Sequence, residues 1–127
     1  FKEVFCKYEF KLPEYEIYID KKLYQYETAT EELKQMSDIS YANIYGGDYG
    51  EILFINKNIN SDRNLLIYSN SFSNAVNKLL ASHYKTTYVI DGRHYKKVNL
   101  VDYIKENNID DVLIIGNSML FWDDIDW

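Results

Sequence analysis

The sequence of 127 residues predicts an α/β fold, because two kinds of apolar pattern follow each other along the chain. From Leu65 onward, short apolar runs alternate with stretches of helical spacing, which is typical of parallel strands joined by helices. Before that point, apolar and polar residues alternate, which indicates antiparallel strands with one solvent-exposed face. We therefore predict a single domain over residues 1–127, with a β-rich part at 1–60 and a βαβαβ half at 61–127.

The amino-terminal part is predicted to be β-rich because its apolar residues recur with a period of two. Pro13 breaks the first run, and Asp20-Lys-Lys22 predicts a turn between the second run and the third. The pattern Thr28-Ala-Thr-Glu31 is a capping box, so we expect it to begin a short helix. The elements expected here are strands at 4–10, 15–19, 23–26 and 52–55 and a helix at 28–36.

The carboxyl-terminal half predicts three parallel strands in one sheet, namely Leu65–Tyr68, Thr87–Ile90 and Val112–Ile115. The stretches between them predict crossover helices, and such connections are nearly always right-handed. The first helix is expected to face the core with Phe72, Ala75, Val76, Leu79 and Leu80.

The polar loops that follow these strands form the candidate functional site. Ser71 follows the first strand, Gly92 the second and Asn117 the third. Because the carboxyl ends of parallel strands meet at one edge of a sheet, we expect these residues to converge on one surface pocket. A serine at a strand-to-helix turn suits a nucleophile, and nearby N–H groups suit an oxyanion. The alternative is that Asn70 or Ser71 only caps the following helix.

Composition excludes several classes of function. The formal net charge of −6 and a pI of about 4.8 argue against nucleic-acid binding, which needs a basic surface. No apolar run is long enough to span a bilayer. Cys6 is the single cysteine, so an internal disulfide and a cysteine metal site are excluded. We predict no metal and no other cofactor.

Several motifs occur in a fixed order along the chain: Tyr45-Gly-Gly-Asp48, Leu65-Leu-Ile67, Asn70-Ser-Phe72, Leu80-Ala-Ser-His-Tyr84 and Asp91-Gly-Arg-His-Tyr95. In this order they resemble the carboxyl-terminal part of the DHHW family. These are bacterial SGNH-like (GDSL-like) proteins related to alginate O-acetylation proteins. The resemblance runs from about Ser40 to about Phe121.

The resemblance implies part of an SGNH-like (flavodoxin-like) three-layer parallel sheet, in which the first parallel strand lies between the other two. It implies Ser71 as the nucleophile and Gly92 and Asn117 as further oxyanion-hole groups. It also implies that Asp48 or the Gly46–Gly47 backbone forms the rim of the site. Arg93 could bind an anionic substrate group, or it could pair with Asp91 or another carboxylate.

By resemblance, the function is that of an acyl-ester hydrolase or O-acetyltransferase acting on cell-surface carbohydrate, at an extracellular or cell-surface location. The Asp-x-His motif that should supply the base is absent, and Asn70 stands where the family has Asp. The histidines present are His83, expected to be remote, and His94, the local candidate base. We expect the chain, which begins at Phe1 without an initiator methionine, to be the carboxyl-terminal part of a larger enzyme and to be inactive alone.

Two other classes of function stay open. One is a non-catalytic binding or scaffold module with a degenerate SGNH fold. The other is a flavodoxin-like domain in which the loop from Ser69 to Ser73 cradles a phosphate. That loop holds no glycine, which argues against the convergence of N–H groups that a phosphate needs.

Overall fold

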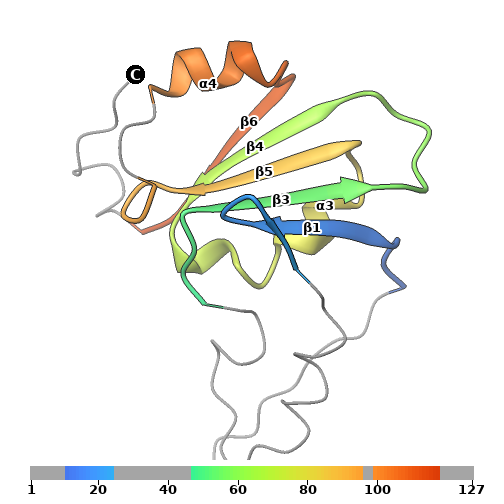
Figure 1. Cartoon of the computed structure of the whole chain (residues 1–127), viewed down its shortest axis with the longest axis horizontal. Helices are drawn as coiled ribbons and strands as arrows, with labels where there is room; N and C mark the ends of the chain where they lie inside the picture. The colour runs from blue at the N-terminus through green and yellow to red at the C-terminus, as the bar shows by residue number, and fades with distance from the viewer. Residues whose placement is uncertain (1–10, 25–46, 96–98, 118–127) are drawn as a thin grey trace, which may run out of the picture.

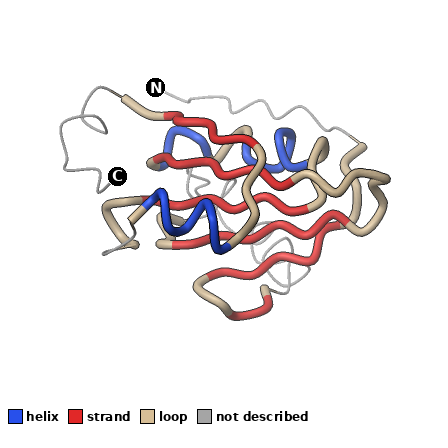
Figure 2. Tube along the Cα trace, turned by 90° about the horizontal axis from the view of Figure 1, so that it is seen from above, coloured by secondary structure: helices blue, strands red, loops and turns tan. Residues whose placement is uncertain are grey.

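The structure is a computed structural model that describes residues 11–24, 47–95 and 99–117. In these ranges the chain forms a six-stranded mixed sheet with the order β2-β1-β3-β5-β4-β6 (Figure 1). The strands are β1 Tyr15–Ile19, β2 Lys22–Leu23, β3 Glu51–Asn56, β4 Asn64–Ser69, β5 Thr86–Asp91 and β6 Asp111–Ile115. The helices are the 3-10 turn η1 Ser71–Ser73 and the α-helices α3 Asn77–Ala81 and α4 Leu100–Glu106. The predicted α/β fold is confirmed, and Figure 2 shows that strands outweigh the short helices.

The parallel half of the sheet is centred on β4. This strand pairs in parallel with β5 on one side and with β6 on the other, and Ser69 lies opposite both Asp91 and Ile115. The three predicted strands are therefore confirmed as parallel neighbours, with the first of them in the middle. Because β4 has a neighbouring strand on each side and apolar side chains pack on both of its faces, it is buried from Leu65 to Ser69.

The other half of the sheet is antiparallel, as predicted. β3 pairs with β5, β1 with β3, and β2 with β1, each in the antiparallel sense. Asp20 and Lys21, between β1 and β2, have φ values of 46° and 67°. Two successive positive φ values characterise the tight hairpin turns whose twist matches that of the strands. The strand expected at 4–10 and the helix expected at 28–36 lie outside the described residues.

The two faces of the sheet carry separate apolar clusters. Ala81 of α3 packs with the side chains of one face, and Leu100 and Tyr103 of α4 pack with those of the other. Among the described residues, no helix has the length and apolar character of a membrane span. The first cluster contains Ile17, Phe54, Leu65, Ile67, Ala81 and Val89, and the second contains Leu66, Tyr68, Ile90, Leu100 and Tyr103.

The segment after β4 differs from the prediction of one helix with an apolar face. The chain makes the turn η1 first and begins α3 later, and both Phe72 and Val76 are exposed. The cause is local polar bonding. The side chain of Asn70 caps η1, and the Ser69 and Ser73 hydroxyl oxygens lie 2.7 Å apart. This buried pair turns Ser73 toward the sheet, so Phe72 points to solvent.

Tyr103 joins α4 to β3, which generates a prediction about alkaline stability. Its hydroxyl donates to Oε1 of Glu51 at 2.7 Å, and burial together with this bond raises the pKa of Tyr103. The unfolded tyrosine ionises near pH 10. A raised folded-state pKa contributes stability that is complete below that pH and is lost as pH rises toward the folded-state value.

We expect Tyr103→Phe to lower the free energy of unfolding at pH 7 by about 1–2 kcal/mol, because the Glu51 carboxylate loses its partner. We also expect the variant to lose less stability than the unchanged protein between pH 9 and pH 11. Urea denaturation at pH 7, pH 9 and pH 11 measures both effects. An unaltered pH dependence in the variant would show that Tyr103 does not carry it.

Candidate functional site

The predicted site residues lie at one edge of the sheet because three strands end level there. The last residue of β4 is opposite the last residues of β5 and β6. Ser71, Gly92 and Asn117 each follow one of these strand ends within two residues. The structure thus brings the three positions together, while their catalytic roles and a shared pocket stay predictions.

The turn that carries Ser71 is held by Asn70. Oδ1 of Asn70 accepts a hydrogen bond from the backbone N–H of Phe72 at 3.2 Å, and its carbonyl oxygen accepts one from the N–H of Ser73 at 3.1 Å. Nδ2 of Asn70 donates to Oδ1 of Asn117 at 3.2 Å, which joins the β4 and β6 loops directly. Capping is therefore the role of Asn70, not of Ser71. The sequence shows Asn70 as a cap but gives no sign of its bond across the sheet.

Gly92 is required by the side chain beneath it. A Cβ atom at this position would lie 1.9 Å from the hydroxyl oxygen of Tyr68 and 2.7 Å from the ring carbon that bears it. The loop after β5 therefore passes directly over Tyr68, a buried residue of β4. Sequence reasoning did not single out Tyr68, because a tyrosine in an apolar run reads as ordinary core.

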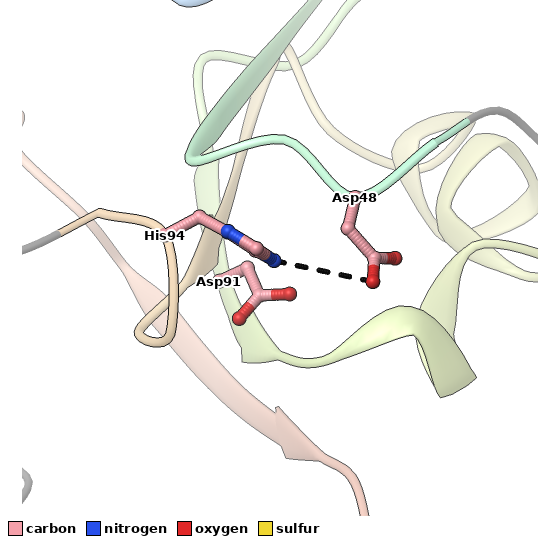
Figure 3. A group of neighbouring side chains, drawn as sticks. All are labelled: Asp48, Asp91 and His94. Carbon is pink, nitrogen blue, oxygen red and sulfur yellow. Dashed lines mark ion pairs between the residues drawn. The ribbon is translucent and has the colours of Figure 1, made fainter.

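Asp48 reaches the same edge from the other half of the sheet. Because β3 runs antiparallel to β5, the segment that precedes β3 lies beside the end of β5. The backbone N–H of Asp91 donates to the carbonyl oxygen of Gly50 at 3.1 Å and so fixes this segment. Figure 3 shows the side chains of Asp48, Asp91 and His94 pointing toward one another.

Arg93 pairs with both carboxylates. Its Nη2 lies 2.5 Å from Oδ2 of Asp91 and 3.1 Å from Oδ2 of Asp48, and its Nε also donates to Asp91. The hydrogen bond with Asp91 raises the pKa of Arg93. Of the two roles considered for Arg93, the structure shows the pairing with carboxylates, and anion binding stays a prediction.

The histidines occupy opposite edges of the sheet. His94 is exposed, and its Nε2 lies 4.0 Å from Oδ2 of Asp48. His83 follows α3 and comes just before β5 begins, so it lies at the far edge. His94 is thus the histidine on the side of Ser71, as predicted.

Asp48, Asp91 and His94 hold ligand atoms within 4.8 Å of one another, a spacing that could hold a metal ion. The guanidinium of Arg93 already pairs with both carboxylates, and its positive charge would oppose a cation at the same place. We therefore assign no metal to this cluster.

Solved structures to which the chain is similar include two of Bacillus cereus PatB1 and one of a DHHW family protein. Bacillus cereus PatB1 is 33% identical with a TM-score of 0.65, over 74% of this chain and 31% of PatB1. A structure of Bacillus cereus PatB1 with a sulfonyl adduct is 38% identical with a TM-score of 0.59, over 64% of this chain and 28% of PatB1. A DHHW family protein from Eubacterium siraeum is 25% identical with a TM-score of 0.56, over 83% of this chain and 36% of that protein.

This chain therefore spans between 28% and 36% of the length of these relatives. Comparisons with protein-family models and with curated proteins find no match. The likeness to a DHHW family protein agrees with the resemblance found in the motifs.

The close approach of Gly92 to Tyr68 predicts that substitutions at these two positions have non-additive effects on the free energy of unfolding. We expect Gly92→Ala to lower the free energy of unfolding by about 1–3 kcal/mol, because the new methyl group meets the Tyr68 hydroxyl. The Gly92→Ala/Tyr68→Phe double variant should lose less than the sum of the single losses, because the nearest atom is gone. Denaturant unfolding of the four proteins measures the coupling, and strict additivity would contradict it.

The pairing of Arg93 predicts that it stabilises the fold. Asp91 is buried, with 7% of its side chain exposed, so Arg93→Ala leaves a buried carboxylate without its main partner. We expect a loss of about 2 kcal/mol or more in the free energy of unfolding. The matched control is Arg63→Ala, which breaks an exposed pair with Asp111 and should cost about 0–1 kcal/mol. Equal losses, measured by urea denaturation, would contradict the structural role.

Proposed function

We propose that this chain supplies the nucleophile and the oxyanion-binding groups of an SGNH-like acyl-ester hydrolase or O-acetyltransferase. The observation that carries the proposal is the level ending of three parallel strands, which gathers Ser71, Gly92 and Asn117 at one edge. Ser71 is the proposed nucleophile. Its own backbone N–H, that of Gly92 and the Asn117 side-chain amide are the proposed donors to the oxyanion.

The comparisons support the same class of reaction. One neighbour is a DHHW family protein, and another is PatB1 with a sulfonyl adduct. A sulfonyl adduct forms when a nucleophilic side chain attacks an electrophilic sulfur, which parallels attack on an acyl carbon. The proposed substrate, an ester on cell-surface carbohydrate, and the proposed extracellular or cell-surface location come from the family resemblance.

The proposed reaction has two acyl-transfer steps. The Ser71 hydroxyl loses its proton to a base while its oxygen attacks the ester carbonyl carbon, and the negative charge develops on the carbonyl oxygen. When this intermediate collapses, the alcohol leaves with a proton and the acyl group stays on Ser71. Water then removes the acyl group in a hydrolase, whereas a sugar hydroxyl removes it in a transferase. Loss of one oxyanion donor typically lowers kcat by about 10²–10³-fold.

The reaction also needs a general base, and the sequence lacks the Asp-x-His motif that supplies it in the family. We propose that residues of the native protein outside this chain supply the base. This chain corresponds to less than two fifths of the length of each relative. His94 beside Asp48 is the alternative within the chain. The rival function is a non-catalytic scaffold, which is favoured by Asn70 in the place of the family's Asp.

Turnover of p-nitrophenyl acetate separates these possibilities. We expect this chain alone to be at least about 10²-fold slower than the native protein that contains it, because a positioned base contributes about 10²–10⁴-fold. Ser71→Ala should abolish the native activity, and His94→Ala should leave it unchanged. Ser61→Ala is the matched control, since Ser61 lies in the loop before β4, at the opposite edge.

Two outcomes would contradict the proposal. Turnover by this chain alone that is lost in both Ser71→Ala and His94→Ala would make it a self-sufficient serine esterase. A native protein that turns over no ester, with or without Ser71, would support the scaffold.

A further inference from the structure

We propose that the dipeptide Asp91-Gly92 is a site of spontaneous backbone isomerisation to isoaspartate, and that the guanidinium of Arg93 protects it in the folded protein. The site lies at the end of β5, at the edge of the sheet where Ser71 follows β4. The inference rests on the geometry of the loop after β5 and does not depend on the proposed function.

The fold requires a residue pair that is prone to this reaction. An aspartate isomerises when the backbone nitrogen of the next residue attacks its side chain, and glycine leaves that nitrogen unshielded because it has no Cβ atom. Gly92 cannot be replaced without a shift of its surroundings, since a Cβ atom there would lie 1.9 Å from the hydroxyl oxygen of Tyr68. Asp-Gly occurs once in the sequence, and Asn-Gly does not occur. The close packing over Tyr68 therefore keeps a reactive pair in the chain.

The reaction needs only a proton and water. The backbone nitrogen of Gly92 forms a bond to Cγ of Asp91, and one carboxylate oxygen leaves as water with the amide proton and a proton from solvent. The product is a succinimide ring, which water then opens at one of its two carbonyl carbons. Attack at Cγ restores aspartate, whereas attack at the main-chain carbonyl carbon of Asp91 gives isoaspartate. The water released in the first step is taken up in the second, so the net change is an isomerisation.

Arg93 holds the carboxylate that this reaction must consume. Oδ1 of Asp91 accepts hydrogen bonds from the backbone N–H and from Nε of Arg93, both at 3.0 Å, and Oδ2 accepts one from Nη2 at 2.5 Å. A carboxylate oxygen bound in an ion pair is a poor leaving group, and these charge-assisted bonds must break before it can leave as water. The side chain of Asp91 is also only 7% exposed, which limits access of the solvent proton.

The guanidinium of Arg93 is the part of this arrangement that opens to solvent. The Arg93 side chain is 40% exposed, and its Nη2 also pairs with Asp48 at 3.1 Å. When the guanidinium turns away, the Asp91 carboxylate loses its main partner and can turn toward the nitrogen of Gly92. Isoaspartate adds one carbon atom to the main chain before Gly92, so its formation would displace Gly92 from its place over Tyr68.

The test is Arg93→Ala, compared with the unchanged protein during incubation at neutral pH. Peptide mass spectrometry with electron-transfer fragmentation distinguishes isoaspartate from aspartate in the peptide that contains Asp91. We expect isoaspartate to accumulate at least about tenfold faster in the folded variant, because a buried carboxylate has lost its main partner. In urea, where both chains are unfolded, the two rates should be nearly equal, and both should exceed the rate in the folded unchanged protein.

Two controls separate the loss of Arg93 from a general loss of stability. Tyr103→Phe removes a hydrogen bond to Glu51 and keeps the ion pair of Arg93 with Asp91, so its isoaspartate rate should stay near that of the unchanged protein. Deamidation of Asn70, measured in the same samples, reports opening of the turn after β4. It should not accelerate in Arg93→Ala, because Asn70 is held by Phe72 and Asn117 rather than by Arg93.

Three outcomes would overturn the inference. Equal rates in the folded unchanged protein and in folded Arg93→Ala would show that Arg93 gives no protection. An acceleration in Arg93→Ala that is matched by Tyr103→Phe and by deamidation of Asn70 would assign the reaction to global unfolding. No isoaspartate from either chain in urea would show that Asp91-Gly92 is not a site of isomerisation. A native protein without ester turnover would refute the proposed function and would leave these results unaffected.

Discussion

The rest of the structure depends on the register in which β4 pairs with strands on both of its edges. Parallel pairing with β5 and with β6 lets the three strands end level. Successive β4 side chains point into different clusters, Leu66 toward α4 and Ile67 toward α3. A slip of one residue would exchange these two faces and would displace Ser71 from its neighbours. The same apolar packing therefore fixes both the core and the candidate site.

The electrostatics of this edge favour a ligand bound by hydrogen bonds rather than by charge. Arg93 is held by Asp91 and Asp48, so an anionic ligand would have to displace a carboxylate that is already paired. An ester carbonyl is neutral before the reaction and becomes negative during it, and N–H groups and an amide nitrogen suit that change. The bond between Asn70 and Asn117 joins the loops that follow β4 and β6. The ion pairs of Arg93 with Asp91 and Asp48 thus hold together the loops at this edge.

The sequence predicts the sheet better than the segment that follows β4. Continuous apolar runs and strict alternation distinguish buried from half-buried strands, so the parallel and antiparallel parts could both be recognised. The apolar spacing that includes Phe72 suggested one helix, but the Ser69–Ser73 pair and the cap by Asn70 override it. The roles of Tyr68 under Gly92 and of Asn70 against Asn117 depend on contacts across strands. Such contacts leave no periodic signal in one chain.

The central claim is that the edge where β4, β5 and β6 end level carries a reactive Ser71. The most direct measurement is covalent labelling of the native protein with a sulfonyl fluoride, followed by mass spectrometry of its peptides. We predict one adduct, on the peptide that contains Ser71, and its loss in Ser71→Ala but not in Ser61→Ala. Labelling that maps to another residue, or equal labelling of the Ser71→Ala protein, would contradict the claim.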